Sequence, residues 1–301
     1  VSYDGRGKEP RTLPIKFPLL LTQGADGIAV GLSTKILPHN FNELIDASIK
    51  VIKGVKPRIL PDFISGGMAD FSNYNDGKRG GKVIIRANIK QVENNNLLIT
   101  EIPFTTNTTS IINSIIKANE KGKIKIKKVE DNTSDNIEIF ITLPSGISPD
   151  KTIDALYRFT DCELSISPTA CVIQDNKPVF LGVSEILQVC TNNTVELLRR
   201  ELEVKKDELQ NKWHAASLEN IFINNRIYHD IEELDIWEEV ISTIRFKIIP
   251  HTKNFIKEVT DEDIIRLTEI KIKRITRFDL NKSKEQISKI EEDIEKVEYN
   301  L

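Results

Sequence analysis

The segment GKVIIRANIKQVENNNLLITEIPF, residues 81–104, decides the fold class of this chain. Residues 83–86 and 97–100 are rich in aliphatic and β-branched side chains, which favour strands, and the asparagines at 94–96 are a turn signal between them. The pattern predicts a β-hairpin made of these two strands. The fold class then depends on the order of the elements that follow it.

Alternating helix and strand patterns follow the hairpin. Isoleucines recur at helical spacing over 110–119, and Gly122 lies beyond the end of that pattern. Strands are predicted at 124–129 and 137–143, and a second helix at 150–159. The repeated β-β-α order predicts an α+β fold in which one helical layer covers a mainly antiparallel sheet.

The sequence before this unit favours short elements. Residues 1–61 contain six prolines and a cluster of glycines, which interrupt regular structure. One helix is predicted over 43–52, because asparagines at 40 and 42 can cap its start and Gly54 can end it.

The last third of the chain has the pattern of a coiled coil. Apolar residues at 3–4 spacing occur twice, at Val195, Leu198, Leu202 and Leu209, and at Ile287, Ile290, Ile294, Val297 and Leu301. About seventy residues with helical patterns of their own separate the two runs. We expect an antiparallel coiled coil with a small helical head, and the alternative is a plain helical domain with long amphipathic helices.

Composition excludes several classes of protein. The chain has 301 residues, of which 39% are hydrophobic and 29% charged, as in folded proteins of more than one domain. The longest apolar run has five residues, at 17–21, whereas a membrane helix needs about 20. Cys162, Cys171 and Cys190 are too few for a disulfide framework, so we expect a reducing, cytoplasmic location. The start at Val1 suggests a segment of a longer chain.

The charge is unevenly distributed. The net charge is −3, yet residues 1–90 carry 14 Lys and Arg against 8 Asp and Glu. A polyanion is therefore expected to bind the N-terminal part.

No pattern of a self-contained active site occurs in the sequence. The four histidines are far apart and lack the neighbours of a metal site, so no metal is expected in this chain. A phosphate-binding G-x-x-x-x-G-K-[ST] loop and a G-x-S-x-G elbow are also missing. We expect no catalytic residue and no cofactor within these residues.

The segment GADGIAVG, residues 24–31, places one large apolar side chain, Ile28, among small residues. Glycines let the backbone approach another surface closely, and a branched apolar wedge can unstack a DNA base step. Basic residues flank the segment at Lys8, Arg11, Lys16 and Lys35. The residues alone leave two interpretations open, a DNA wedge and an ordinary core residue.

Seven motifs occur in a recognisable order. They are YDG at 3–5, LPIKFPLLL at 13–21, GADGIAVG at 24–31, TKILPHN at 34–40, GKVIIRA at 81–87, TEIPF at 100–104 and LTEIKIKRI at 267–275. In order and spacing they resemble the A subunit of bacterial type IIA topoisomerases, the family of topoisomerase IV and DNA gyrase. We favour topoisomerase IV between the two.

The resemblance implies a domain organisation. Residues 1–60 would be the end of the DNA-binding breakage-reunion core, 61–180 an α/β tower domain, and 181–301 an antiparallel coiled coil with a helical C-gate head at about 215–280. The last motif, at 267–275, is similar to the helix that precedes the returning strand of the coiled coil. Apolar head residues that could serve the interface are Phe222, Ile223, Trp237, Ile241 and Phe246, although the core of the head explains most of them better.

The resemblance also implies a function. The chain would be part of an ATP-dependent isomerase that passes one DNA duplex through another, and Ile28 would be the residue that intercalates and bends the gate segment. Phosphate contacts are expected from Lys16, Lys35, Lys78, Arg79, Lys82 and Arg86. His39 matches a family motif as well, but entry into the helix at 43–52 explains it equally.

Catalysis would need residues outside this chain. The cleaving tyrosine of the family follows an arginine, and none of the five tyrosines here does, so all five are expected to be structural, with Tyr157 the most buried. Magnesium and ATP would be used by a partner B subunit in an A2B2 assembly, and two A subunits would pair through the C-gate. The fragment alone would not cleave DNA.

Two other functions remain open at this stage. A DNA-architectural protein with a coiled-coil arm would have the same basic part and helices without any cleavage activity. A protein-interaction scaffold would have them without binding DNA.

Overall fold

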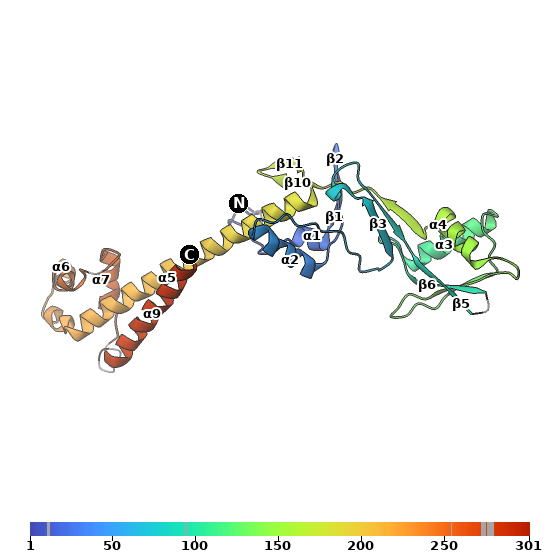
Figure 1. Ribbon diagram of the computed structural model, residues 1–301. Coiled ribbons are helices and arrows are strands. Elements are labelled where there is room, and N and C mark those ends of the chain that lie inside the picture. The colour runs from blue at the N-terminus through green and yellow to red at the C-terminus, as the bar shows by residue number, and fades with distance from the viewer. Residues whose placement is uncertain (11–12, 94, 254, 272–274, 276–279) are drawn as a thin grey trace. The chain divides into compact units, whose positions relative to one another are not determined.

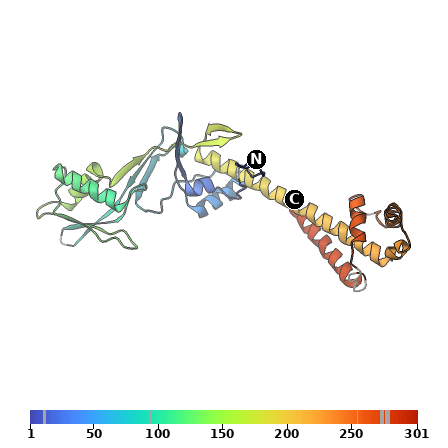
Figure 2. The same ribbon diagram turned by 180° about the vertical axis from the view of Figure 1, so that it is seen from behind.

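The computed structural model describes residues 1–10, 13–93, 95–253, 255–271, 275 and 280–301 (Figure 1; seen from behind in Figure 2). The chain divides into two units, Val1–Thr194 and Val195–Leu301. Helix α5 (Val183–Asn224) begins in the first unit and continues into the second. Among the described residues, two hydrophobic cores lie in the first unit and one lies in the second.

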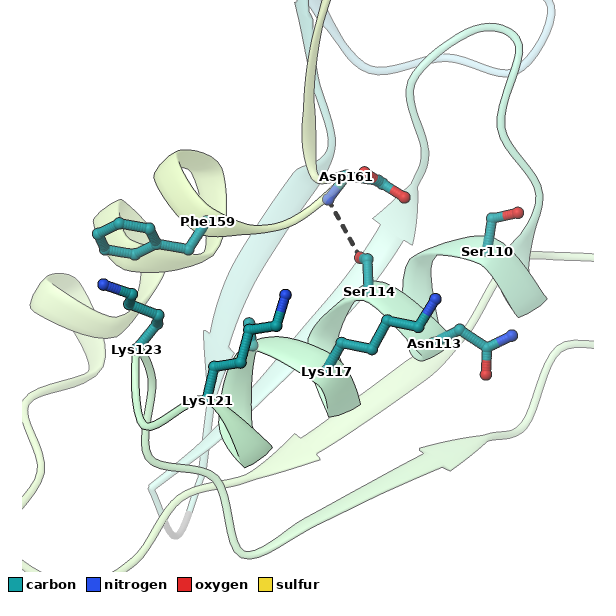
Figure 3. A pocket seen from close by; sticks show the side chains of 9 residues that line it. Ser110, Asn113, Ser114, Lys117, Lys121, Lys123, Phe159 and Asp161 are labelled. Atoms are coloured by element: carbon teal, nitrogen blue, oxygen red, sulfur yellow. Dashed lines mark hydrogen bonds between the residues drawn. The ribbon is translucent and has the colours of Figure 1, made fainter.

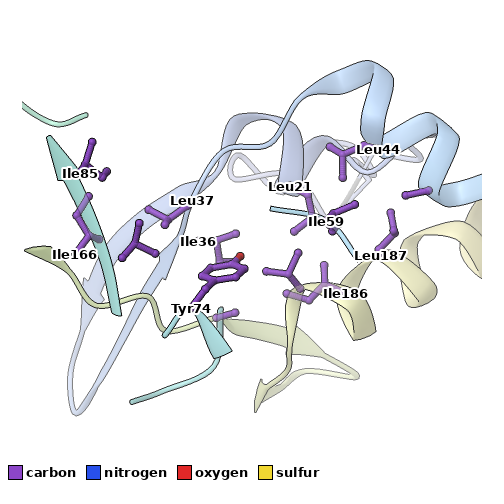
Figure 4. Packing of buried hydrophobic residues seen from close by; sticks show 14 residues of the cluster. Leu21, Ile36, Leu37, Leu44, Ile59, Tyr74, Ile85, Ile166, Ile186 and Leu187 are labelled. Atoms are coloured by element: carbon purple, nitrogen blue, oxygen red, sulfur yellow. The ribbon is translucent and has the colours of Figure 1, made fainter. Parts of the chain in front are cut away.

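The first core is formed by short elements at the N-terminus (Figure 4). They are α1 (Leu19–Gln23), β1 (Ala25–Ala29), β2 (Leu32–Ile36) and α2 (Phe41–Ile52). Helix α2 confirms the sequence prediction, since the Asn40 side chain accepts hydrogen bonds from the N–H groups of Asn42 and Glu43. Its apolar face buries Leu44 and Ala47 in this core.

A three-stranded antiparallel sheet packs on the same core. Its order is β3-β4-β9, with β3 at Met68–Asn73, β4 at Lys82–Arg86 and β9 at Glu163–Ile166. Along β4 the side chains alternate, so that Val83 and Ile85 are fully buried while Lys82 and Arg86 are exposed. The basic residues of this strand therefore share one outward face.

A second sheet, with four antiparallel strands, lies beside two helices. The strands are, in spatial order, β5 (Asn88–Val92), β6 (Asn96–Glu101), β8 (Ile139–Thr142) and β7 (Lys128–Asp131). Helices α3 (Thr108–Glu120) and α4 (Pro149–Phe159) contribute to its core, which includes Ile99, Ile111, Ile115, Ile141 and Leu156. The predicted helical layer on a mainly antiparallel sheet is confirmed.

The predicted hairpin is wrong in one of its strands. The asparagine turn does lead into β6, but the partner of β6 is β5, and β4 belongs to the three-stranded sheet. The chain changes sheet at Ala87, whose N–H donates to the carbonyl of Cys162 at 2.8 Å. Because apolar and polar residues keep alternating through this change, the sequence does not mark it.

A small hairpin leads into α5. It consists of β10 (Cys171–Gln174) and β11 (Lys177–Phe180). The first turns of α5 then bury Val183, Ile186 and Leu187 in the first core. The short 3₁₀ helix η1 (Asn75–Gly77) is joined to this point, because the Asp76 carboxylate accepts hydrogen bonds from the N–H and the hydroxyl of Ser184.

The second unit is helical. After α5 it contains η2 (Ile227–Ile231), α6 (Trp237–Ile248), η3 (Ile249–His251), α7 (Asp261–Thr268) and α9 (Leu280–Asn300). Helix α9 runs antiparallel to α5, since Trp213 Nε1 donates to Glu291 at 2.8 Å and Lys206 Nζ lies 2.9 Å from Glu298. The predicted α+β fold, with a helical region after the mixed part, is confirmed.

Details of the helical prediction differ. Leu209 is buried, whereas Val195 and Leu198 are 49% and 43% exposed. Helix α7 ends at Thr268, so the motif at 267–275 is not one continuous helix, and its residues 272–274 lie outside the described part of the chain.

The five apolar head residues divide into two groups. Phe222 and Ile223 are buried in the head core, and Ile241 packs against it. Trp237 and Phe246 are 50% and 76% exposed. Among the described residues, no helix is both long enough and apolar enough to span a membrane.

Candidate nucleic-acid interface

The hairpin β1–β2 presents Ile28 near its tip. The strands pair in antiparallel register from Ala25 to the turn at Val30 and Gly31, where Gly31 has a φ of 74°. Ile28 is 92% exposed and Val30 is 103% exposed. Ile28 is therefore not part of a hydrophobic core in the described structure. This excludes the interpretation of Ile28 as an ordinary core residue.

The base of the hairpin is held firmly. A Cβ atom at Gly24 would lie 2.5 Å from the Ile36 carbonyl oxygen, so the chain passes Ile36 at a distance that only glycine allows. On the outer edge of β2, the Lys35 N–H donates to the Thr169 carbonyl at 2.7 Å. The Lys35 ammonium also lies 3.0 Å from the Asp26 carboxylate on β1. The apolar tip of the hairpin thus projects from a base in which β2 contacts both Thr169 on its outer edge and Asp26 on β1.

Gly27 leaves bare backbone beside Ile28. A Cβ atom there would meet only the Thr34 methyl group, at 3.9 Å, which is an ordinary contact. Packing within the chain therefore does not require glycine at this position. A glycine here does let another surface approach the backbone closely, as insertion of the neighbouring side chain into DNA would need.

Several of the predicted basic residues already pair with carboxylates in the described part of the chain. Lys35 pairs with Asp26, Lys78 Nζ lies 3.0 Å from Glu185, and Arg86 Nε donates to Glu163 at 2.6 Å. The hydrogen bond that Arg86 donates to Glu163 raises the pKa of Arg86, and the guanidinium also lies over the Tyr157 ring, 5.1 Å from its centre. These pairs reduce the charge that each residue offers to a phosphate.

Arg79 and Lys82 are the candidates with free charge. Both are exposed, and neither side chain forms an ion pair or hydrogen bond within the part of the chain that the structure describes. They follow η1 and begin β4. Gly81, between them, is close-packed, since a Cβ atom there would lie 2.3 Å from the Tyr74 carbonyl oxygen. Lys16 is exposed in the segment that precedes α1.

One short segment joins the hairpin to this basic turn. Thr169 bonds with the main chain of Lys35 in both directions, at 2.7 and 3.0 Å. The next residue, Ala170, donates its N–H to the Gly77 carbonyl at 3.2 Å, two residues before Arg79. The wedge candidate and the free basic residues are therefore attached to the same scaffold.

His39 has a structural role. It is 4% exposed, its Nδ1 lies 3.2 Å from the Leu21 carbonyl oxygen, and its Nε2 lies 3.4 Å from the Tyr74 hydroxyl. Because the Leu21 oxygen only accepts, Nδ1 carries the proton and Nε2 accepts from Tyr74. Burial lowers the pKa of His39, so the neutral ring is favoured.

The sequence analysis missed one basic cluster. Lys117, Lys121 and Lys123 line a hollow beside α3, together with Phe159 (Figure 3). In the sequence they look like the solvated face of a helix, because Phe159 lies in another element and nothing local links it to them. Their recurrence at i, i+4 and i+6 is the only sequence signal.

Comparison with known proteins identifies the family. A family model of the DNA gyrase/topoisomerase IV A subunit matches residues 1–301. The chain belongs to this family. The A subunit of DNA topoisomerase 4 from Borreliella burgdorferi is 36% identical over 300 residues, which cover 100% of this chain and 48% of that protein. The A subunit of DNA gyrase from Chlamydia muridarum is 27% identical, over 99% of this chain and 37% of its own length.

A third relative gives the same result. The A subunit of DNA topoisomerase 4 from Staphylococcus aureus is 27% identical over 93% of this chain and 36% of its own length. The chain therefore spans about half the length of these relatives or less. The names of these relatives are those of topoisomerases, which are isomerases.

The tyrosines Tyr74 and Tyr157 of this chain are buried and half-buried, respectively. Tyr74, not Tyr157, is the most buried, with 4% exposed, and burial raises its pKa. Tyr157 is half-buried and donates its hydroxyl to the Ala87 carbonyl at 2.9 Å. Within the described ranges no three His, Cys, Asp or Glu side chains gather as a metal site would require.

Proposed function

We propose that this chain is the DNA-bending and dimerising part of a type IIA topoisomerase A subunit. Membership of the gyrase and topoisomerase IV A-subunit family supports the class of protein. The observation that carries the proposal is the 92% exposure of Ile28 beside the bare backbone of Gly27. A large apolar side chain in water is costly for a free protein, and insertion between base pairs would bury it.

The energetics of bending favour a wedge on a firm base. Unstacking a base step costs a few kcal/mol, which is recovered when bent DNA contacts more of the protein. Each free cation that contacts a phosphate releases counterions, so Arg79 and Lys82 would contribute most among the predicted residues. Lys16, Lys35, Lys78 and Arg86 would follow, after exchange of their present partners for phosphates.

The remaining chemistry would come from partners. We infer that cleavage uses a tyrosine outside this chain, and that a partner B subunit uses magnesium and ATP in an A2B2 assembly in the cytoplasm. Two copies of the chain would pair through the helical head, the proposed C-gate. Trp237 and Phe246, exposed on α6, are the apolar residues that could serve this contact.

A bending assay tests the wedge. A short duplex labelled at both ends would report its end-to-end distance by FRET at fixed low salt, with the wild type and the Ile28→Ala variant. We expect the wild type to shorten the distance and the variant to bind without shortening it. Ile173→Ala is the matched control, because Ile173 is also an exposed isoleucine on a hairpin, with 73% exposed.

Two results would contradict the proposal. Equal bending by the wild type and by folded Ile28→Ala would show that Ile28 is not the wedge. Absence of any salt-dependent DNA binding, both for this chain and for a longer one that includes the upstream tyrosine, would instead favour a protein-interaction scaffold.

A further inference from the structure

A hollow of about 550 Å³ lies between α3 and the turn that joins α4 to β9 (Figure 3). Its lining includes Asn113, Lys117, Lys121, Lys123, Phe159 and Asp161. These residues belong to the mixed α/β part of the first unit. In the sequence they are far from the hairpin that carries Ile28. Membership of the family does not by itself give these residues a role.

Local structure brings the three lysines together. Lys117 and Lys121 are four residues apart, so they lie on one face of α3. Gly122, with a φ of 67°, then reverses the chain, and the Lys123 N–H donates to the Ala118 carbonyl at 3.0 Å. This helix end returns Lys123 to the face that carries the other two. Figure 3 shows Lys123 directed toward Phe159, Lys117 directed toward Asn113 and Lys121 extending between them.

The charges in the hollow are not balanced by the protein. In the described part of the chain none of the three lysines forms an ion pair, and Lys123 only lies over the Phe159 ring, 5.8 Å from its centre. Asp161 is the single acidic residue in the lining, and its main-chain N–H donates to the Ser114 hydroxyl at 3.1 Å. Three ammonium groups against one carboxylate leave an excess of two positive charges.

We propose that this hollow binds a compact polyphosphate, an anion with two or more linked phosphate groups. Its volume lies in the range of about 300–1,000 Å³ that is typical of small-ligand sites. An ammonium group binds phosphate as a point charge without a fixed direction, so three of them suit several linked phosphates. The Asn113 amide adds a neutral donor at the rim, and a multivalent anion relieves the repulsion among the lysines.

A purely structural role for the lysines makes a different prediction. Lys117 lies in the last turn of α3 and Lys121 is its C-cap residue, so that their positive charge offsets the negative end of the helix dipole. If that were their only role, their removal would lower the melting temperature while no anion bound. Stability and binding must therefore be measured on the same variants.

Calorimetric titration of the protein with inorganic tripolyphosphate at low salt tests the proposal. We expect one site per chain, with affinity that decreases from tripolyphosphate to pyrophosphate to sulfate. The double variant Lys117→Gln, Lys121→Gln should bind about tenfold or more weakly. Lys151→Gln, which removes an exposed lysine of α4 outside the lining, should bind as the wild type does. Failure of the wild type to bind, or equal binding by the double variant, would overturn the proposal.

A second arm distinguishes a free polyphosphate from the backbone of DNA. If the double variant loses tripolyphosphate binding and keeps wild-type affinity for a duplex, the hollow serves a free anion. If it loses both, and tripolyphosphate competes with the duplex, the phosphates belong to DNA and the proposal of a free ligand fails. The titration uses the protein without DNA, so its outcome is independent of the proposed bending.

Discussion

The main chains of Lys35 and Thr169 are joined by two hydrogen bonds, from Lys35 N–H to the Thr169 carbonyl at 2.7 Å and from Thr169 N–H to the Lys35 carbonyl at 3.0 Å. Ala170 continues the connection to Gly77, close to Arg79. The hairpin that carries Ile28 and the turn that carries the free cations therefore share one support. Such a support would let phosphate contacts resist the force that bent DNA exerts on a wedge.

The glycine at the base of the hairpin should be essential for stability. Gly24 has a φ of 73° and a ψ of 177°, a conformation that essentially only glycine adopts, and a Cβ atom there would lie 2.5 Å from the Ile36 oxygen. We expect Gly24→Ala to lower the free energy of unfolding by about 3 kcal/mol or more in urea denaturation, since strain and a backbone clash act together.

Gly31→Ala is the matched control for this experiment. Gly31 also has a positive φ, of 74°, but nothing lies within 4 Å of the added Cβ atom. Its substitution should cost only about 1–2 kcal/mol of conformational strain. Equal losses for the two variants would show that the close approach to Ile36 is not the cause.

The free cations should determine much of the salt dependence of DNA binding. The slope of log Kobs against log salt is negative, and its magnitude falls by about 0.9 for each phosphate contact that is lost. We expect the double variant Arg79→Ala, Lys82→Ala to flatten the slope by about 2, as measured by fluorescence anisotropy at several salt concentrations.

A double variant elsewhere controls for the change in net charge. Lys284→Ala, Lys289→Ala removes two exposed lysines of α9 in the second unit. We expect its slope to equal that of the wild type. An unchanged slope for the Arg79 and Lys82 variant would remove both residues from the interface, and the paired cations would then have to supply the contacts.

Local signals and distant contacts explain what the sequence could predict. Helix α2 was predictable because its cap, Asn40, and its buried face both lie within one short stretch. The change of sheet at Ala87 was not, because the alternation of apolar and polar residues continues through it without a turn signal. The ion pair of Arg86 with Glu163 joins strands that are 77 residues apart in sequence, so no local pattern reveals that this cation is occupied.

The site shows the same division. Composition placed Ile28 among small residues but could not distinguish an exposed wedge from a core side chain, since both need a large apolar group. Its exposure follows from the pairing of β1 with β2, which places it beside a two-residue turn. The lysines of α3 were missed for a related reason, because Phe159 and Asp161, which complete the hollow, come from another element.

Acid should destabilise the first unit through His39. The pKa of His39 is lowered by burial, so the folded protein holds the ring neutral below the ordinary value of 6.5, where the unfolded chain binds a proton. The contribution of His39 to the free energy of unfolding is therefore fully present above that value. It is lost as the pH falls below it, by at most about 1.4 kcal/mol per pH unit.

Denaturation followed by circular dichroism from pH 7.5 to pH 5.5 measures this effect. We expect His39→Gln to be less stable at pH 7.5 but to lose less stability on acidification than the wild type. His251→Gln is the control, because His251 is exposed. Parallel pH profiles for the wild type and His39→Gln would assign the acid sensitivity to other groups.

Two phenylalanines of the head should have opposite effects on folding and assembly. Phe222 is 2% exposed within the head core, whereas Phe246 on α6 is 76% exposed. Phe222→Ala should cost about 3–5 kcal/mol of stability, because it leaves a cavity. Phe246→Ala should leave the melting temperature of the monomer unchanged and weaken dimerisation by about tenfold or more, since exposed aromatic residues that become buried contribute most to interfaces.

Sedimentation equilibrium over a range of concentrations measures the dimerisation constants of the wild type and of Phe246→Ala. A wild type that stays monomeric at micromolar concentration would contradict an autonomous C-gate, and a Phe246→Ala variant that dimerises as the wild type does would place the interface on another surface of the head.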